Sequence, residues 1–361
     1  MKLSSISLSS HDKPIIMDAT NENVAVLGAG IIGVCSALCL VENEPNLNVT
    51  LISAKLSPDT TSDNSGGLIM PYLIGNVADE RLNFWCKKTF DFLLNIYKSP
   101  FAVKAGVSLI SAYALTEQEE DEAAYIKKGF INVRKLSEEE IRRFSAEYKH
   151  GYFVTTLYAE CKMLLPFLME KFKEKGGRIR VQTVEKLEQL MNEFDLVVNC
   201  TGLGSYELVS DKRLYPIRGQ VLRVKAPWVK HCVMAGNNYV IPNTECVVLG
   251  GTKQKGEWNL AVDGEDHEHI SQGCLKIFKN LQSAQTICES VCLRPYRDEP
   301  LLEMEIINFN GKRIPVIHNY GHGGCGVTLA WGCAQEVHHL VKKWLLTGVS
   351  SRTDSTFFSK L

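Results

Sequence analysis

The first part of the chain has the hydrophobic pattern of a strand, a glycine turn and a helix in succession. A short apolar run over residues 23–27 (NVAVL) leads directly into GAGIIG at 28–33, and helical spacing of apolar residues follows in VCSALCLVENEP. A second apolar run, LNVTLIS at 47–53, completes the unit. Strand, helix and strand in this order predict a Rossmann-like βαβ unit.

Further along the chain, helical and strand patterns alternate. Residues 164–177 (LLPFLMEKFKEKGG) predict a helix that ends at a glycine pair, and RIRVQTV after it predicts a strand. Residues 194–202 (FDLVVNCTG) form an apolar strand that belongs beside the first one. In WVKHCVMAGNNYVIPNTECVVLGGT at 228–252, alternation and turn residues predict antiparallel strands.

Two short polar segments indicate local helical features. Ser137 followed by Glu140 is typical of a helix capping box. The acidic stretch EQEEDE at 117–122 is interpreted as a solvated helix face.

Composition narrows the class of protein. The 361 residues include 40 Lys and Arg against 41 Asp and Glu, so the formal net charge is −1, and 45% of the residues are apolar. This balance is typical of a soluble globular protein of about two domains. It argues against a nucleic-acid binder, which needs clustered cations, and no apolar run reaches the ~18 residues of a membrane span.

The twelve cysteines are scattered, without Cys-x-x-Cys pairs or Cys/His clusters. We therefore expect reduced, buried thiols, no structural metal and a reducing intracellular compartment.

Both ends of the chain have a polar composition. Residues 1–22 are Ser-rich without an apolar core, which indicates a disordered leader and not a secretory signal. Residues 349–361 form a short tail that ends in Ser359, Lys360 and Leu361, the tripeptide read by the peroxisomal import receptor. We expect a location in the peroxisomal matrix.

The glycine turn has the spacing that binds a dinucleotide. Gly28 permits a tight turn, Gly30 lets the backbone approach a pyrophosphate, and Gly33 lets the helix pack on the strand, while the helix N-terminus offers N–H groups to the phosphates. The alternative is a glycine turn without a nucleotide. The carboxylate that usually ends the second strand is absent, since the chain has Ser53 followed by Ala-Lys. Either Ser53 or a backbone group replaces this carboxylate, or the ribose is held more loosely.

Seven short segments occur together in the order and spacing of one known family. They are VAVLGAGIIG (24–33), ISAKLSPDTTSDNSGGLIMPY (52–72), DLVVNCTGLG (195–204), RGQVLRVKAPW (218–228), LGGTKQKGEWN (249–259), LRPYR (293–297) and HNYGHGGCGVTLAWG (318–332). From residue 24 to about 345 the chain resembles the D-amino-acid oxidase family of FAD flavoproteins, and within it the branch that acts on D-aspartate.

The resemblance implies a fold and a domain organisation. The expected fold class is α/β, with a Rossmann-like FAD-binding domain interleaved with an antiparallel-β-rich α+β substrate domain. The expected FAD-binding segments are 23–75, 157–206 and 303–348, and the expected substrate segments are 76–156 and 207–302.

The resemblance also implies a reaction. A D-amino acid would lose a hydride from its α-carbon to flavin N5, the imino acid would hydrolyse, and dioxygen would reoxidise the flavin to give hydrogen peroxide. No protein base is expected if the amine is neutral when it reacts. Two alternatives from other classes are a nicotinamide dehydrogenase, which does not account for GHGGCGVT, and a non-catalytic flavin-binding paralogue.

Three residues match the family's substrate-binding positions. Arg294 would bind the α-carboxylate through a bidentate fork, Tyr239 would donate its hydroxyl to the same carboxylate, and the carbonyl of Gly324 would accept from the amino group. The alternatives are an ordinary ion pair for Arg294 and a solvent-facing strand tyrosine for Tyr239. Arg297 is the better candidate for an ordinary ion pair.

Cofactor contacts are implied in the same way. The backbone of Gly67 and Leu68 would meet the flavin ring, Thr328 would bond a flavin carbonyl oxygen unless it is only a helix N-cap, and Val184 would contact the adenine side. His322 is interpreted as a structural histidine. The full expected set is Gly28, Ala29, Gly30, Ile31, Ile32, Gly33, Lys55, Thr60, Thr61, Ser62, Gly67, Leu68, Val184, Thr201, Gly202, Gly323, Gly324, Gly326, Val327 and Thr328.

Substrate choice is where the chain departs from the branch it resembles. The branch usually presents two arginines to the side-chain carboxylate, and here Met234 and Lys253 stand at those positions, with Tyr72 where a histidine is usual. Lys253 retains one cation as a point charge. We expect a slight preference for acidic D-amino acids, D-aspartate and D-glutamate; the alternative is a broad oxidase of neutral D-amino acids.

Overall fold

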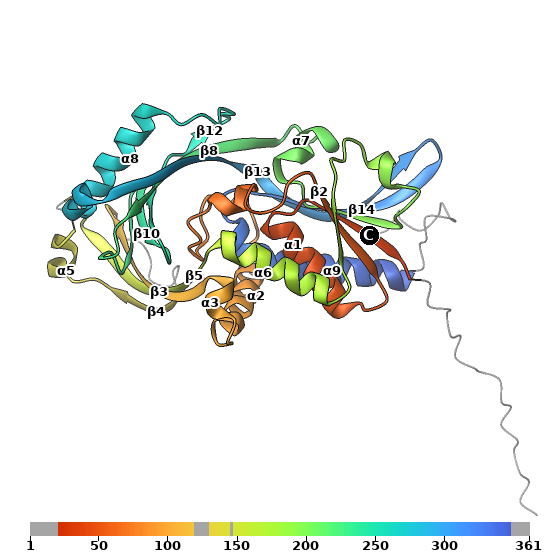
Figure 1. The fold of residues 1–361 in the computed structure, drawn as a ribbon, viewed down its shortest axis with the longest axis horizontal. Coiled ribbons are helices and arrows are strands. Elements are labelled where there is room, and N and C mark those ends of the chain that lie inside the picture. The colour runs from red at the N-terminus through yellow and green to blue at the C-terminus, as the bar shows by residue number, and fades with distance from the viewer. Residues whose placement is uncertain (1–20, 119–129, 145–146, 348–361) are drawn as a thin grey trace, which may run out of the picture.

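A computed structural model describes residues 21–118, 130–144 and 147–347 (Figure 1). The predicted tail at 349–361 lies outside the described residues, as do nearly all of the leader at 1–22 and most of the acidic segment at 117–122. None of the described helices is long and apolar enough to cross a membrane.

The predicted βαβ unit is confirmed at the start of the chain. Strand β1 (Asn23–Leu27) leads through helix α1 (Ile31–Asn43) into β2 (Asn48–Ser53), which pairs with β1 in parallel. Three more parallel strands extend this part of the sheet, with β7 beside β1 as predicted. They are β6 (Arg178–Val181), β7 (Leu196–Asn199) and β14 (Lys312–His322).

Helices cover this part of the sheet and enclose α1. Helix α1 is buried over most of its circumference because its residues are nearly all apolar or small. The helices packed around the same core are α2 (Asp79–Tyr97), α6 (Cys161–Glu174) and α9 (Gly326–Thr347). In Figure 1, α1, α6 and α9 lie together beside β2 and β14.

The other half of the sheet is mainly antiparallel. The predicted meander over 228–252 is confirmed as β9 (Cys232–Ala235), β10 (Asn238–Pro242) and β11 (Val247–Gly250). The remaining elements of this half are β3 (Val107–Thr116), β4 (Ile131–Lys135), β5 (His150–Ala159), β8 (Leu214–Lys225), β12 (Gln254–Lys255) and α8 (Gly264–Ile277). Short helices are α3 (Ala102–Ala105), α5 (Glu138–Arg142) and α7 (Ser205–Leu208).

One long strand, β13 (Gln285–Phe309), joins the two halves into one sheet. Its first part pairs with β8 and its second part with β14, both antiparallel. The predicted boundary between residues 302 and 303 therefore falls inside a continuous strand. Helix α2, which belongs to a predicted substrate segment, packs against α9. The predicted α/β fold class with an antiparallel half is confirmed, and the domain boundaries stay a prediction.

Three smaller expectations can be checked. Ser137 accepts a hydrogen bond from the Glu140 N–H and begins α5, which confirms the capping box. All twelve cysteines are free and ten of them are buried. Arg297 forms the predicted ion pair, since its Nε lies 2.8 Å from Asp211 Oδ2 and both side chains are buried.

Candidate active site

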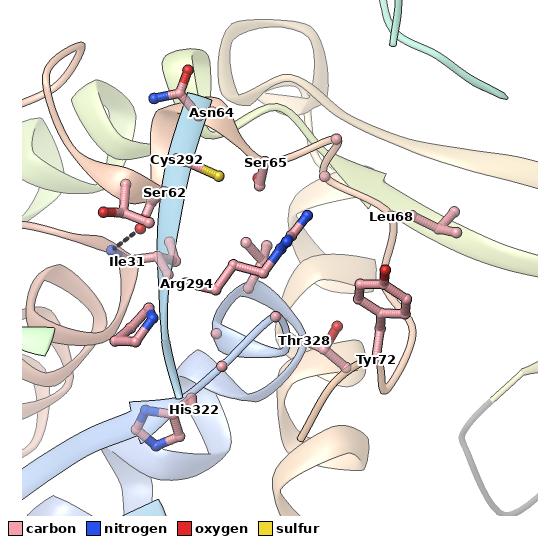
Figure 2. Close-up of a pocket in the computed structure, with 18 of the residues that line it drawn as sticks. Ile31, Ser62, Asn64, Ser65, Leu68, Tyr72, Cys292, Arg294, His322 and Thr328 are labelled. Atoms are coloured by element: carbon pink, nitrogen blue, oxygen red, sulfur yellow. Dashed lines mark hydrogen bonds between the residues drawn. The ribbon is translucent and has the colours of Figure 1, made fainter. Parts of the chain in front are cut away.

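A cavity of about 930 Å³ runs from the glycine turn after β1 to the hairpin between β9 and β10. Segments far apart in the sequence line it, and Figure 2 shows side chains from several of them around Arg294. The predicted site residues that line this cavity are Gly28, Ala29, Gly30, Ile31, Ile32, Lys55, Thr60, Thr61, Ser62, Gly67, Leu68, Tyr72, Thr201, Gly202, Met234, Tyr239, Arg294, Gly323, Gly324, Gly326, Val327 and Thr328.

Three predicted site residues lie outside the cavity wall. Gly33 faces the glycine turn. Lys253 lies on the exposed segment after β11, next to Tyr72. The side chain of Val184 packs against an apolar cluster that includes Ala25 and Leu27 of β1. The predicted adenine contact involves the Val184 backbone and stays a prediction.

The glycine turn is required by close packing at two positions. Gly28 has φ +95°, and a Cβ there would lie 2.5 Å from the carbonyl oxygen of Cys200. A Cβ on Gly33 would lie 1.8 Å from the carbonyl oxygen of Gly28. The turn, the helix and the neighbouring strand therefore approach one another only because these two residues lack side chains.

Helix α1 directs its N-terminus into the cavity. The Ile31 N–H donates to Ser62 Oγ at 3.0 Å (Figure 2). The loop that carries Ser62 is braced by the neighbouring Asp63, which is 2% exposed and accepts hydrogen bonds from Ser57 Oγ at 2.6 Å and from the Thr60 N–H at 3.0 Å. Sequence reasoning missed Asp63, although Thr60 and Asp63 have the spacing of a capping box.

The end of β2 shows how the missing carboxylate affects the site. Ser53 and Lys55 both line the cavity, and the Ser53 hydroxyl donates to the carbonyl oxygen of Lys55 at 2.7 Å. The hydroxyl proton is thus used within the loop. The Ser53 oxygen retains capacity to accept a hydrogen bond.

A second helix end reaches the cavity at its other side. The Gly323 N–H donates to the Pro295 carbonyl oxygen at 2.7 Å, and the Gly324 N–H donates to the Leu73 carbonyl oxygen at 3.1 Å. Helix α9 begins two residues later at Gly326. These bonds bring Arg294, which precedes Pro295 on β13, next to the positive end of helix α9.

Thr328 ties this helix to the segment before Tyr72. Its Oγ1 accepts from the Met70 N–H at 3.0 Å and donates to the Met70 carbonyl oxygen at 2.9 Å. The only hydroxyl proton of Thr328 is therefore engaged with the protein. A side-chain bond from Thr328 to a flavin carbonyl would require that this bond be exchanged.

Arg294 presents its guanidinium to the cavity from β13. The side chain is 8% exposed, and Nη1 donates to the carbonyl oxygen of Thr252 at 3.0 Å. Gly219, on the paired strand β8, provides the space, because a Cβ there would lie 2.3 Å from Nη1 and Nη2. A guanidinium is always charged and has five N–H donors, so donors remain for an anion.

Two tyrosines lie beside Arg294. The hydroxyl of Tyr239 lies close enough to the Arg294 guanidinium for the two groups to interact, and Gly250 makes room for the Tyr239 ring. This contact argues against the solvent-facing alternative. Burial raises the pKa of Tyr239 and of Tyr72, so both are protonated donors at neutral pH. The Tyr72 hydroxyl is buried and has no hydrogen-bond partner among the described residues.

Lys253 lies at the edge of this group. Its Nζ donates to Asn237 Oδ1 at 3.1 Å and lies 5.1 Å from the centroid of the Tyr72 ring. Burial and the charge of Arg294 lower the pKa of the Lys253 ammonium. Met234 lines the cavity and offers only apolar contact there. Asn237 was not predicted as a site residue, because nothing in its local sequence connects it to Lys253.

His322 lines the cavity but is enclosed by the protein. Burial lowers the pKa of His322 to about 4, so the ring is neutral at physiological pH. Its Nε2 lies 3.6 Å from Cys333 Sγ and its ring packs edge-on against Trp85. These contacts fit the structural role expected from the sequence.

The donor set fits an extended dinucleotide that carries a flat, polar ring system. The cavity is lined by two helix N-termini, by backbone at the glycine turn, and by Tyr72, whose buried hydroxyl has no partner within the part of the chain that the structure describes. Helix N-termini stabilise negative charge, which suits a pyrophosphate at one end and an electron-rich ring at the other.

Comparison with known proteins agrees with this geometry. The family model described as "FAD dependent oxidoreductase" matches residues 23–340. The chain is 39% identical to human D-aspartate oxidase over 89% of this chain and 94% of the relative, and 39% identical to the D-amino acid oxidase of Dugesia ryukyuensis over 90% and 98%.

Solved structures share the fold at low sequence identity. Glycine oxidase from Geobacillus kaustophilus superposes with a TM-score of 0.74 at 16% identity, covering 93% of this chain and 97% of that one. The family model and the relatives show that the chain belongs to the family of FAD-dependent oxidoreductases, and FAD is its cofactor.

Proposed function

We propose that this chain catalyses the FAD-dependent oxidative deamination of D-amino acids. A D-amino acid, water and dioxygen would give a 2-oxo acid, ammonia and hydrogen peroxide. The observation that carries the proposal is the buried guanidinium of Arg294, which opens into the cofactor cavity beside the Tyr239 hydroxyl. Relatives named D-aspartate oxidase and D-amino acid oxidase support the substrate class.

The chain's own residues would bind and orient the substrate. Arg294 and Tyr239 hold the α-carboxylate by charge-assisted hydrogen bonds, and the Gly324 carbonyl accepts from the amino group. With two of its groups fixed, the substrate has its α-C–H in one orientation. FAD, when bound, supplies the hydride acceptor. His322 is neutral and enclosed by the protein, so we give it no role as a base toward the substrate's amine.

We further propose a preference for acidic D-amino acids. Lys253 is the cation that supports it, since its Nζ lies 5.1 Å from the centroid of the Tyr72 ring and close enough to Arg294 for that guanidinium to lower its pKa. One observation favours the alternative of neutral substrates: Met234 gives the cavity wall an apolar side chain near Tyr239.

A substrate panel separates these possibilities. Steady-state kcat/KM is measured for D-aspartate, D-glutamate and D-alanine with the wild type, Lys253→Met and Lys255→Met. The last variant is the matched control, because Lys255 lies over Tyr215, outside the cavity wall. Acidic preference predicts that Lys253→Met lowers kcat/KM for D-aspartate about tenfold and leaves D-alanine unchanged. An equal fall in kcat/KM for D-aspartate and D-alanine would show that Lys253 does not bind the substrate's side chain.

Import into peroxisomes stays a proposal that rests on Ser359, Lys360 and Leu361. A hydrogen peroxide product suits such a compartment. Fluorescence microscopy of an N-terminally tagged chain tests it: punctate signal that becomes diffuse when Leu361 is deleted supports import, and diffuse signal from the intact chain contradicts it.

A further inference from the structure

Thr252 connects the carboxylate-binding arginine to the central sheet. The residue is 7% exposed and follows β11 directly after the Gly250–Gly251 pair. Its carbonyl oxygen accepts from Arg294 Nη1 at 3.0 Å. Its hydroxyl oxygen accepts from the backbone N–H of Gln220 at 2.9 Å. The two bonds use two different groups of one residue, so the hydroxyl bond fixes where the carbonyl acceptor lies.

Strand β8, which donates the Gln220 N–H to Thr252, also provides the space for the Arg294 guanidinium. Gln220 follows Gly219 on β8, and Gly219 is the residue whose missing side chain admits Arg294. The Gln220 side chain is itself fixed, because Nε2 donates to the Asp263 carbonyl oxygen and Oε1 accepts from the Asp263 N–H, both at 2.9 Å. The acceptor for Arg294 is therefore anchored to a rigid, fully buried part of the sheet.

We propose that Thr252 is a positioning residue for the proposed reaction, acting through Arg294. Its hydroxyl holds the carbonyl that engages Nη1, and this turns the remaining donors of the fork toward the substrate carboxylate. The inference rests on the proposed function, since it assumes that Arg294 binds the α-carboxylate. Every D-amino acid has that carboxylate, so the effect of Thr252 is independent of the substrate side chain.

The variant Thr252→Val has nearly the same shape and removes the hydroxyl acceptor, while Thr252→Ser retains it. We expect Thr252→Val to raise KM about tenfold for D-alanine and for D-aspartate alike, which corresponds to about 1.4 kcal/mol. The Kd of propanoate, an unreactive carboxylate followed by the flavin absorbance, should rise by the same factor. The Kd of FAD should change less than twofold, and Thr252→Ser should behave as the wild type.

Several outcomes decide the matter. A wild-type propanoate Kd in Thr252→Val, with only a lower Tm, would show that Thr252 is merely structural and overturn the proposal. If Thr252→Val does not fold, Thr252→Ala, which places no methyl against the Gln220 N–H, is measured in the same way. If the wild type binds propanoate but oxidises no D-amino acid, the proposed function fails while the propanoate comparison still tests Thr252. If the wild type oxidises D-amino acids without binding propanoate, the KM comparison alone tests Thr252; if it neither binds propanoate nor oxidises any D-amino acid, both proposals fail.

Discussion

The guanidinium of Arg294 occupies the space that a side chain on Gly219 would fill. An added Cβ at Gly219 would lie 2.3 Å from both Nη1 and Nη2 of Arg294, closer than any stable contact. These residues are neighbours across β8 and β13, where Gly219 pairs with Cys292. The glycine on β8 therefore belongs to the proposed carboxylate-binding site as much as the arginine does.

Gly219→Ala should displace the guanidinium without removing its charge. Because a shift of about 1 Å in a substrate-binding group costs on the order of 100-fold in rate, we expect kcat/KM to fall by about that factor for all D-amino acids. FAD binding, measured by flavin fluorescence, should be retained. Gly264→Ala is the control, since a Cβ at Gly264 meets nothing within 4 Å. Full activity of Gly219→Ala would contradict the geometry of this site.

Arg294 and Arg297 should respond differently to the same substitution. Arg297 is paired with the buried Asp211, which also accepts a hydrogen bond from Tyr320 at 3.0 Å. Arg297→Met would remove the buried cation that pairs with Asp211 and leave this carboxylate with Tyr320 and the exposed Arg213, so the free energy of unfolding should fall by up to about 3–5 kcal/mol. Arg294→Met should abolish turnover with a much smaller loss of stability. Urea unfolding and assays of both variants check this, and equal destabilisation would refute the division of roles.

Gly33→Ala should damage the dinucleotide turn. A Cβ there would lie 1.8 Å from the Gly28 carbonyl oxygen, so α1 has to move away from β1. Overpacking of this kind costs about 1–3 kcal/mol of stability, and it displaces the helix N-terminus that is expected to face the pyrophosphate. We expect a lower Tm and a Kd for FAD raised at least about tenfold. Unchanged FAD affinity would show that the helix position is not needed for binding.

His322 should make stability depend on pH. Its pKa is about 4 in the folded chain, below the ordinary value of about 6.5 for an unfolded histidine, so the unfolded state binds more protons. The stability that the neutral His322 ring allows is therefore fully present above pH 6.5 and is lost as the pH falls toward 4. About 2 kcal/mol of the free energy of unfolding is lost in this way between pH 7 and pH 5. In urea unfolding, the free energy of unfolding of His322→Gln should fall by about 2 kcal/mol less than that of the wild type between pH 7 and pH 5. If the free energies of the two proteins change equally with pH, His322 is not the group that titrates.

Hydrophobic periodicity and glycine spacing allowed much of the parallel part of the sheet, with its glycine turn, to be predicted. The strand, glycine turn and helix from Asn23 to Asn43 are adjacent in sequence, and their periodicity and glycine spacing are set by local geometry. The same applies to the β9–β10–β11 meander, whose turns are short. The ion pair of Arg297 was expected only as a type of contact, because nothing in the local sequence indicates Asp211, 86 residues away.

The contacts that complete the site could not be predicted, because they join distant segments. Thr252 meets Arg294 across 42 residues, and Lys253 meets Asn237 across the hairpin. The continuous path of β13 through both halves of the sheet depends on pairing with β8 and β14 along its length. In each case the role of the residue is set by a tertiary neighbour and not by its own sequence context.

The most direct test mixes the FAD-loaded protein with D-aspartate or L-aspartate in the absence of oxygen and follows the visible absorbance of the flavin. The account predicts that D-aspartate bleaches the flavin, that L-aspartate does not, and that Arg294→Met is bleached by neither. Bleaching by L-aspartate, or no bleaching by D-aspartate, would contradict it.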